Sequence, residues 1–375
     1  MKEGDDMNFI NGELMSRDKA IAKVEDNIIT FGNEKLLPLY LKRTRNIRNW
    51  LSLRVMDDTR FNVRKLKELF HLENKDDVDI SMLVNGATIY DYYWFRQVDS
   101  NLTYEEVRFK ENKYDRLALM GDGSDIDHYI TRTPEFTNIG SFEKCWKLID
   151  GKWWLYKQGN ENEFFSELFI CKLSEKLGIV TAHYEKDGDY IRSLDLTDGA
   201  SVNYEPIYSL VGEDEDYQNC FETLIDLSED LAKQYLILIW MDTIIFNMDR
   251  HTQNFGFLRD IDTGEIISLA PNFDNNVALI SRGYPKDVSR EKDGLIRFFR
   301  DFITSCDDAK EMYRDMRLPT ITQEMISTCF DEIDIEVDRK FISEFILNGQ
   351  KIIKDIIYND ENKLKDEEDK CGLML

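Results

Sequence analysis

The residues Asn247–Asn254, which read NMDRHTQN, decide the fold of this chain. They follow the stretch 235–246 (YLILIWMDTIIF), which is apolar at nearly every position and is therefore typical of a helix buried on all sides. Asp226 and Glu229 have the spacing of a helix capping box, so we expect one buried helix from there through Phe246. The polar octapeptide begins where this helix is expected to end.

A hairpin is expected directly after the octapeptide. The sequence predicts a strand over 255–258, a turn at 262–264 (DTG) and a second strand over 265–269. Asp274 follows this hairpin. One short antiparallel hairpin thus separates the octapeptide 247–254 from Asp274.

Asp249 and Asn254 have the spacing of the protein-kinase catalytic loop, H-R-D-x-x-x-x-N. In that loop the Asp accepts the proton of the acceptor hydroxyl, the Asn holds Mg²⁺, and a further Asp binds the metal. An isolated pair of this kind would more often form a turn. The buried helix before it and Asp274 after it favour a catalytic loop, with Asn254 and Asp274 as metal ligands. We take Asp249 and His251 as the candidate catalytic pair. For His251 we favour a structural role, in which its ring holds the loop, rather than a role as a proton carrier.

Upstream residues predict a small lobe. Asp150-Gly151 between two apolar arms is a strong signal for a two-residue hairpin turn, and Gly178 is a helix stop. The expected elements are strands over 145–149 and 152–157, a helix from Asn160 or Asn162 to Leu177, and strands over 181–185 and 190–194. This order is typical of a small nucleotide-binding lobe.

Lys157 ends the second arm of the first hairpin, where its ammonium group can reach a phosphate. Glu167 on the following helix is a candidate partner, as in the lysine–glutamate pair of kinases. Glu163, one turn earlier, is the alternative partner, and a plain surface position is the alternative for each of these residues.

Composition limits the function further. The chain has 375 residues, of which 42% are hydrophobic, and a formal net charge of −25, so it is long enough for a two-lobed globular enzyme. The negative charge disfavours direct nucleic-acid binding and anionic membranes. The six cysteines lack C-x-x-C spacing, and the longest apolar run, 235–241, is far shorter than the roughly 20 residues that span a bilayer. With no secretory signal evident, we expect a cytoplasmic protein with reduced thiols.

Three segments, FNMDRHTQNFGFL, LAPNFD and TNIGSFEKCW, resemble the HipA-like serine/threonine kinases, a family typified by bacterial toxin kinases. The resemblance covers about residues 130–300. It implies that the loop 137–144 replaces the glycine-rich loop of other kinases and binds phosphate. It also implies that the loop hydroxyl can be autophosphorylated, with Thr137 and Ser141 as candidates. The ATP-binding residues that it implies are Thr137, Gly140, Lys144, Lys157 and Glu167, and it assigns the base to Asp249 and the metal ligands to Asn254 and Asp274.

The expected fold class is α+β. We predict a two-lobed protein-kinase-like fold with a small mixed β-sheet lobe, a mainly helical large lobe and an additional N-terminal α/β region. The expected domains are an accessory region over 1–130, the small lobe over 131–205, and the large lobe with C-terminal helices over 206–375. Residues 1–130 do not resemble the N-terminal domain of the toxin, which leaves open whether an antitoxin partner exists.

The leading functional hypothesis is an ATP- and Mg²⁺-dependent serine/threonine protein kinase in a toxin–antitoxin setting, with a protein substrate and an antitoxin or regulator protein as a candidate partner. One alternative is a phosphatidylinositol-kinase-like or small-molecule kinase, because D-R-H-x-x-N also occurs in lipid kinases. The other alternative is a regulatory module that binds nucleotide without catalysis.

Overall fold

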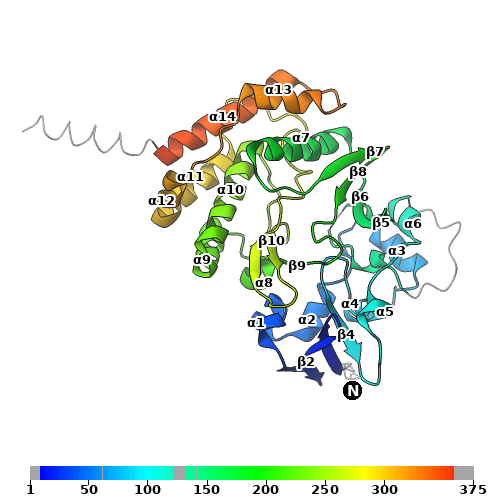
Figure 1. Ribbon diagram of the computed structural model, residues 1–375. Helices are drawn as coiled ribbons and strands as arrows, with labels where there is room; N and C mark the ends of the chain where they lie inside the picture. Colours follow the sequence, from blue (N-terminus) through cyan, green and yellow to red (C-terminus); the bar gives the residue numbers. More distant parts are fainter. Residues whose placement is uncertain (1–8, 61, 121–131, 141, 359–375) are drawn as a thin grey trace, which may run out of the picture. The chain divides into compact units, whose positions relative to one another are not determined.

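The computed structural model describes residues 9–60, 62–120, 132–140 and 142–358 (Figure 1). Its chain forms two compact units. The first unit lies within 1–159, 185–210 and 256–270, and the second within 160–184, 211–255 and 271–375. The predicted α+β class is confirmed, with strands gathered in the first unit and long helices in the second.

An antiparallel sheet begins the first unit. Its strands run in the order β3-β2-β1-β4, with β1 at Gly12–Ser16, β2 at Lys19–Glu25, β3 at Ile28–Phe31 and β4 at Tyr93–Gln97. Trp94 and Phe95, neighbours on β4, are both fully buried, but in two different hydrophobic clusters. Successive side chains of a strand point to opposite faces, so this sheet is covered on both sides at β4.

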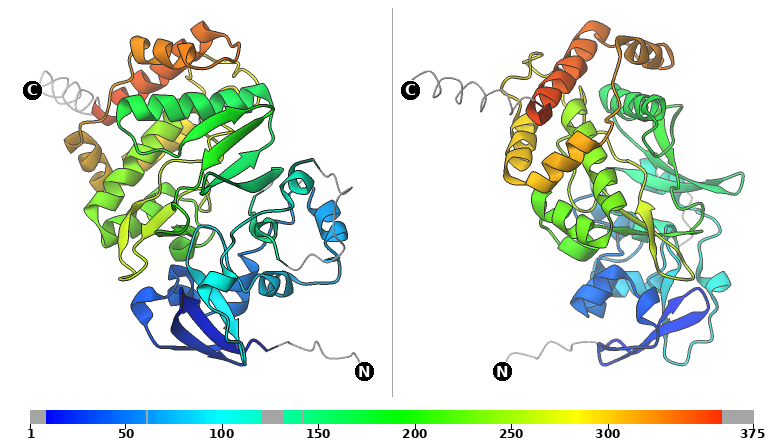
Figure 2. Two further views of the ribbon diagram at one scale, coloured as in Figure 1. Left: turned by 45° about the vertical axis from the view of Figure 1, so that its right-hand side comes forward. Right: turned by 60° about the vertical axis from the view of Figure 1, so that its left-hand side comes forward.

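Short helices accompany this sheet (Figure 2). They are the 3₁₀ helix η1 at Glu34–Leu36 and the α-helices α1 at Leu39–Thr44, α2 at Ile47–Ser52, α3 at Val63–Leu69, α4 at Asp77–Leu83, α5 at Tyr104–Val107 and α6 at Asp115–Met120. A second 3₁₀ helix, η2, covers Pro134–Thr137.

The predicted small-lobe hairpin is present. It consists of β5, Lys144–Ile149, and β6, Lys152–Lys157, in a sheet of order β5-β6-β8-β7 with β7 at Tyr184–Asp187 and β8 at Tyr190–Leu194. Both turn residues, Asp150 and Gly151, have positive φ angles (50° and 77°), as the two-residue turn requires. Strand β7 begins three residues later than predicted because the N–H group of Ala182 donates to Asn272, whose own N–H group donates to Val180.

The hairpin predicted after the octapeptide is also present. Strands β9 (Asn203–Pro206), β10 (Gly256–Arg259) and β11 (Ile266–Leu269) form an antiparallel sheet of order β11-β10-β9. A side chain at Gly256 would overlap the backbone of Glu205 and Pro206, so only glycine lets β10 and β9 approach this closely.

Helices build the second unit. They are α7 at Glu161–Leu177, α9 at Tyr217–Leu227, α10 at Glu229–Ile245, α11 at Gly294–Ser305, α12 at Asp307–Asp315, α13 at Gln323–Asp331 and α14 at Arg339–Tyr358, while the short α8 (Tyr208–Val211) falls at the unit boundary. Helix α7 starts at Asn160, where Glu163 completes a capping box, and stops at Gly178 with a φ of 70°, as predicted. Helix α10 packs against α9, α11 and α14 and is buried along most of its length (Figure 1).

The predicted start of one helix is wrong. The capping box expected from Asp226 and Glu229 does not form, because Asp226 lies inside α9. Ser228 has an extended conformation that ends α9, and its side chain accepts the N–H group of Asp230 to start α10. The predicted helix is therefore present as α10, with Ser228 as its cap, and α9 before it was not predicted.

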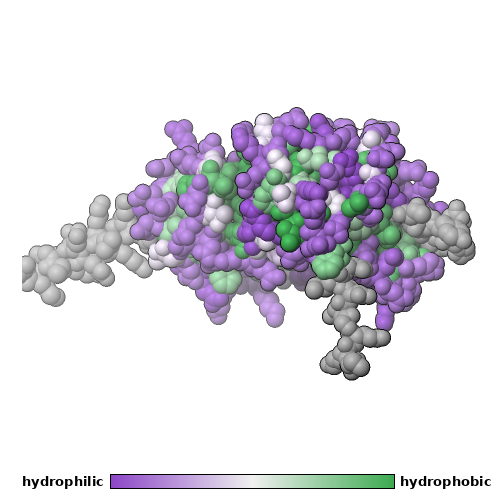
Figure 3. All heavy atoms as spheres, turned by 90° about the horizontal axis from the view of Figure 1, so that it is seen from below, coloured by the Kyte–Doolittle hydropathy of each residue, from purple (hydrophilic) through white to green (hydrophobic). Residues whose placement is uncertain are grey.

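Polar side chains predominate on the face shown in Figure 3, in keeping with the net charge of −25. Among the described residues, no helix is both long and apolar enough to cross a membrane. The five described cysteines are buried free thiols.

Candidate functional site

The candidate catalytic loop begins at the end of α10. Phe246 caps the helix in the left-handed conformation, with a φ of 56°, and its N–H group donates to the carbonyl of Asp242. The chain then turns through Asp249 and Asn254, and Asp274 belongs to the same unit. All of the predicted base and metal positions are thus carried by the second unit.

A buried ion pair anchors this loop to the helix. The guanidinium group of Arg250 donates two hydrogen bonds to the carboxylate of Asp242, at 2.8 and 3.0 Å, and both side chains are almost completely buried. Asn247 donates to the same carboxylate at 3.0 Å and accepts the N–H group of Asp249 at 3.2 Å. The backbone at Asp249 is therefore tied to the core of α10.

Arg250 also joins the loop to the segment that contains Asp274. One of its terminal nitrogens, Nη1, donates to the carbonyl oxygens of Asn254 and Phe273, at 2.7 and 2.8 Å. The other, Nη2, donates to the side-chain oxygens of Asn272 and Asn275, at 2.8 and 2.9 Å. A single planar cation thus holds together the two segments that carry the predicted metal ligands.

The candidate catalytic loop is fixed internally by its own polar groups. The side-chain nitrogen of Asn254 donates to the carbonyl of Asp249 at 2.9 Å. The side-chain oxygen of Asn254 therefore points away from the carbonyl of Asp249. Nδ1 of His251 accepts the N–H group of Gln253 at 3.2 Å, so this ring is part of the loop's own hydrogen bonding. Burial raises the pKa of the half-buried Asp249, and the charge of Asp274 raises it further.

The segment around Asp274 has its own supports. Asp274 has a φ of 60°, and its N–H group donates to the hydroxyl of Tyr184 at 2.9 Å. The next N–H group, that of Asn275, donates to the carboxylate of Glu167 at 2.9 Å. Glu167, predicted as the partner of a lysine, is fully buried on α7 and here fixes the backbone that follows Asp274.

The side chains of Asn254 and Asp274 have the chemistry of magnesium ligands. A carboxylate and an amide oxygen are hard oxygen donors, which Mg²⁺ prefers, and it usually completes its shell with water and substrate phosphates. A cation held there would also relieve the repulsion between the carboxylates of Asp249 and Asp274. Among the described residues, no group of three or more His, Cys, Asp or Glu side chains is arranged to hold a metal.

The predicted phosphate-binding loop lies in the first unit. The hydroxyl of Thr137 is buried and donates to the carbonyl of Pro134 at 2.8 Å. Gly140 has a φ of 103°, in the region that favours glycine, and the ammonium group of Lys144 folds back to donate to the carbonyl of Ile139. The hydroxyl of Thr137 is thus turned inward.

A buried carboxyl group supports the base of this loop. Glu135 is fully buried and accepts hydrogen bonds from Asn112, Asn138 and the N–H group of Trp146, at 2.6, 2.7 and 3.1 Å. Arg60, equally buried, lies 3.8 Å from the same carboxylate. Burial raises the pKa of Glu135 to about 7.

Lys157 is buried at the end of β6 in the first unit, whereas Glu167 belongs to the second, and the pair between them stays a prediction. Glu163, the alternative partner, is used by the capping box of α7. Ser141, a candidate phosphorylation site, lies outside the described residues.

Sequence reasoning missed the residues that assemble the site, namely Asp242, Arg250, Asn247, Asn275 and Tyr184. Asp242 carried a usable signal, because a carboxylate inside an apolar helix needs a cationic partner. Arg250, eight residues later, is such a cation.

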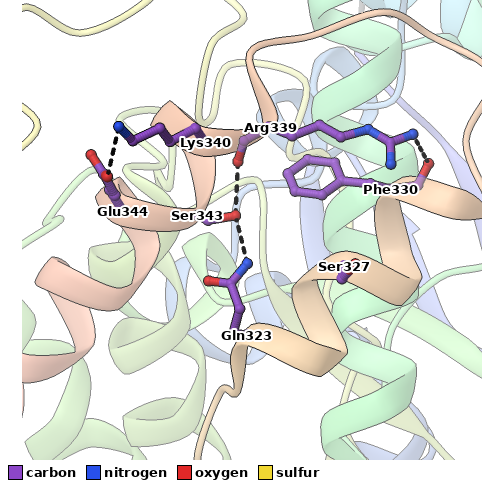
Figure 4. A pocket seen from close by; sticks show the side chains of 7 residues that line it. All are labelled: Gln323, Ser327, Phe330, Arg339, Lys340, Ser343 and Glu344. Carbon is purple, nitrogen blue, oxygen red and sulfur yellow. Dashed lines mark hydrogen bonds and ion pairs between the residues drawn. The ribbon is translucent and has the colours of Figure 1, made fainter.

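A separate hollow of about 300 Å³ lies on α13 and α14 (Figure 4). Gln323 donates to Ser343, which donates to the carbonyl of Arg339, and Lys340 lies 3.8 Å from Glu344. These polar groups bind one another, and none of the predicted site residues lines the hollow.

No protein-family model and no curated protein matches the sequence. Among solved structures, the toxin–antitoxin protein HipA of Shewanella oneidensis MR-1, in a complex with HipB and its operator DNA, matches with a TM-score of 0.58 and 10% identity, over 92% of this chain and 97% of that one. The proinflammatory kinase CtkA of Helicobacter pylori matches with a TM-score of 0.47 and 18% identity, over 59% of this chain and 95% of that one.

The match to HipA is too extensive to be confined to residues 131–375. The match therefore includes part of residues 1–130. The chain has the fold of the HipA-like kinases, which confirms the fold that the sequence resemblance implies.

Proposed function

We propose that this protein is an ATP- and Mg²⁺-dependent serine/threonine protein kinase of the HipA-like type. The observation that carries the proposal is the network around Arg250, which brings the segments of Asp249, Asn254 and Asp274 together within one unit. The HipA-like fold supports the same reading. Phosphoryl transfer needs this arrangement, because it depends on positioning and charge neutralisation more than on covalent chemistry.

In this proposal Asp249 accepts the proton of the acceptor hydroxyl. Its raised pKa makes it a stronger base than an ordinary aspartate. Asn254 and Asp274 hold Mg²⁺, and His251 keeps the loop in shape. When bound, Mg²⁺ neutralises the charge of the ATP phosphates.

The first unit contributes the phosphate-binding residues in this proposal. Gly140 and Lys144 form a compact loop for phosphate, and Lys157 supplies a second ammonium group. Thr137 is a candidate for autophosphorylation, which requires its buried hydroxyl to leave the carbonyl of Pro134. Such a reaction would open the loop and silence the enzyme.

A regulator protein is the proposed partner. The solved HipA structure contains HipB and operator DNA, and a HipB-like regulator is a corresponding candidate for this chain. We propose a cytoplasmic enzyme with no nucleic-acid contacts of its own, because its net charge of −25 repels a phosphate backbone.

The test is incubation with radiolabelled ATP and Mg²⁺, followed by mass spectrometry of the phosphorylated residues. We expect labelled protein from the wild type and a loss of at least about a hundredfold for Asp249→Asn, the usual contribution of a general base. Asp301→Asn, an exposed residue on α11, is the matched control and should behave as the wild type. Equal labelling by Asp249→Asn would sink the proposal.

Two other outcomes separate the alternatives. Phosphate transfer to lipid vesicles or to a small alcohol, but not to protein, would assign a lipid or small-molecule kinase, which the D-R-H-x-x-N sequence also fits. Tight ATP binding by isothermal titration without any phosphorylated product would assign a nucleotide-binding regulatory module.

A further inference from the structure

Resting on the proposed kinase function, we infer that Arg250 is a positioning residue that sets the affinity of the site for its divalent cation. It does so by cross-linking the loop of Asn254 to the segment of Asp274 before any metal binds.

The cross-link acts directly at the ligand positions. Nη1 of Arg250 donates to the carbonyl of Asn254, itself a proposed ligand, and to that of Phe273, the residue before Asp274. Because one nitrogen holds both carbonyls, neither segment can move away without breaking a hydrogen bond from a charged donor. Such bonds are about twice as strong as neutral ones.

The cross-link is also fixed in space. The same guanidinium group is held by both oxygens of Asp242 on the buried helix α10. Side-chain oxygens of Asn272 and Asn275 accept its remaining N–H groups. All five N–H donors of the arginine are therefore used, and its orientation is fixed by the core.

The electrostatics favour the same role. Asp249 and Asp274 repel each other, which opposes bringing their segments together. The buried positive charge of Arg250 attracts both carboxylates and so offsets part of that repulsion. A lysine has one nitrogen in place of the planar fork, so it can retain the charge but not the bridging geometry.

The experiment compares Arg250→Lys with Arg54→Lys. Arg54 is a buried arginine of the first unit that also binds a carboxylate through two nitrogens, that of Asp91, but it has no hydrogen bond to the ligand segments. Mn²⁺ binding is measured by electron paramagnetic resonance in the presence of a non-hydrolysable ATP analogue. The Mg²⁺ dependence of ATP turnover and the melting temperature are measured on the same full-length proteins.

We expect Arg250→Lys to raise the half-saturating concentrations of Mn²⁺ and Mg²⁺ by about ten- to a hundredfold, the usual effect of losing a group that orients metal ligands. Arg54→Lys should leave both concentrations unchanged, even if its melting temperature falls by as much as that of Arg250→Lys. Unchanged metal affinity in Arg250→Lys, or an equal change in both variants, would overturn the inference.

A milder variant covers the case in which Arg250→Lys does not fold. Asn275→Ala removes one acceptor of Arg250 and should weaken Mn²⁺ binding by a smaller factor; unchanged binding would overturn the inference. A wild type that binds Mn²⁺ beside the ATP analogue but transfers no phosphate would refute the proposed function and still allow the metal-affinity comparison. A wild type that binds no Mn²⁺ would refute both.

Discussion

Replacing Gly349 with alanine should destabilise the second unit, although alanine is the better helix former. Gly349 lies inside α14, where a Cβ atom would overlap Nη1 of the buried Arg290 and lie 3.5 Å from the carbonyl of Ile244. Arg290 donates to the carbonyls of Thr243 and Ile244, which end α10 and lack partners within the helix. The glycine thus leaves room for the arginine that caps the helix before the catalytic loop.

The magnitude follows from three contributions. Alanine in place of glycine in a helix stabilises by about 1 kcal/mol. Displacing Arg290 removes a hydrogen bond from a charged donor, about 1.5–3 kcal/mol, and crowding a packed site costs about 1–3 kcal/mol. We therefore expect the free energy of unfolding to fall by about 1.5–5 kcal/mol, the opposite sign to helix propensity alone.

Urea unfolding followed by far-UV circular dichroism, together with calorimetry, measures this change. Gly294→Ala is the matched control, because Gly294 is the first residue of α11 and has no atom near the position of an added Cβ. That variant should be neutral or slightly more stable. A Gly349→Ala protein as stable as Gly294→Ala would refute the reasoning.

Three further predictions concern buried polar groups and the phosphate-binding loop. Burial raises the pKa of Glu135 from 4.5 to about 7, so the folded state retains a proton that the unfolded state releases. Stability should therefore fall as pH rises from about 4.5 to 7, and Glu135→Gln should flatten this decline in urea titrations; an equal slope in both proteins contradicts the prediction. Gly140→Ala should weaken ATP binding in isothermal titration, because its φ of 103° disfavours a side chain, whereas Gly188→Ala, at an open turn, should not. Tyr184→Phe should lower the free energy of unfolding by about 1–3 kcal/mol, since the N–H group of Asp274 loses its acceptor, and unchanged thermal unfolding would count against this.

Local chemistry made part of the fold predictable from sequence. Asn160 and Gly178 bound α7 because capping depends on a few neighbouring residues. The turn at Asp150-Gly151 was predictable for the same reason. The cap of α10 was not predicted correctly: Asp226 was expected, but Ser228 caps the helix, because either residue type can accept an N–H group.

The candidate site was predictable only in its outline. Spacing along the chain made Asp249, Asn254 and Asp274 candidates, because the kinase loop fixes the number of residues between its Asp and its Asn, and a hairpin separates this loop from the second Asp. The hydrogen bonds of Arg250 were not predictable, because they join a helix, a loop and a segment more than twenty residues away that meet only in the folded chain. Similarly, Glu167 and Tyr184 accept the N–H groups of Asn275 and Asp274. These contacts were not predictable, because they form only where α7 and the segment after it lie beside these N–H groups in the folded chain.

The chain passes between its two units five times, at residues 159–160, 184–185, 210–211, 255–256 and 270–271. A single proteolytic nick at 184–185, 210–211 or 255–256 would leave two fragments that each contribute to both units, and a nick at 159–160 or 270–271 would leave one unit built from both fragments. Nicked protein should therefore co-elute as one species under native conditions and separate only when denatured. For the same reason, neither unit can be excised by one cut, and a gene fusion or split-protein design would have to respect all five passages.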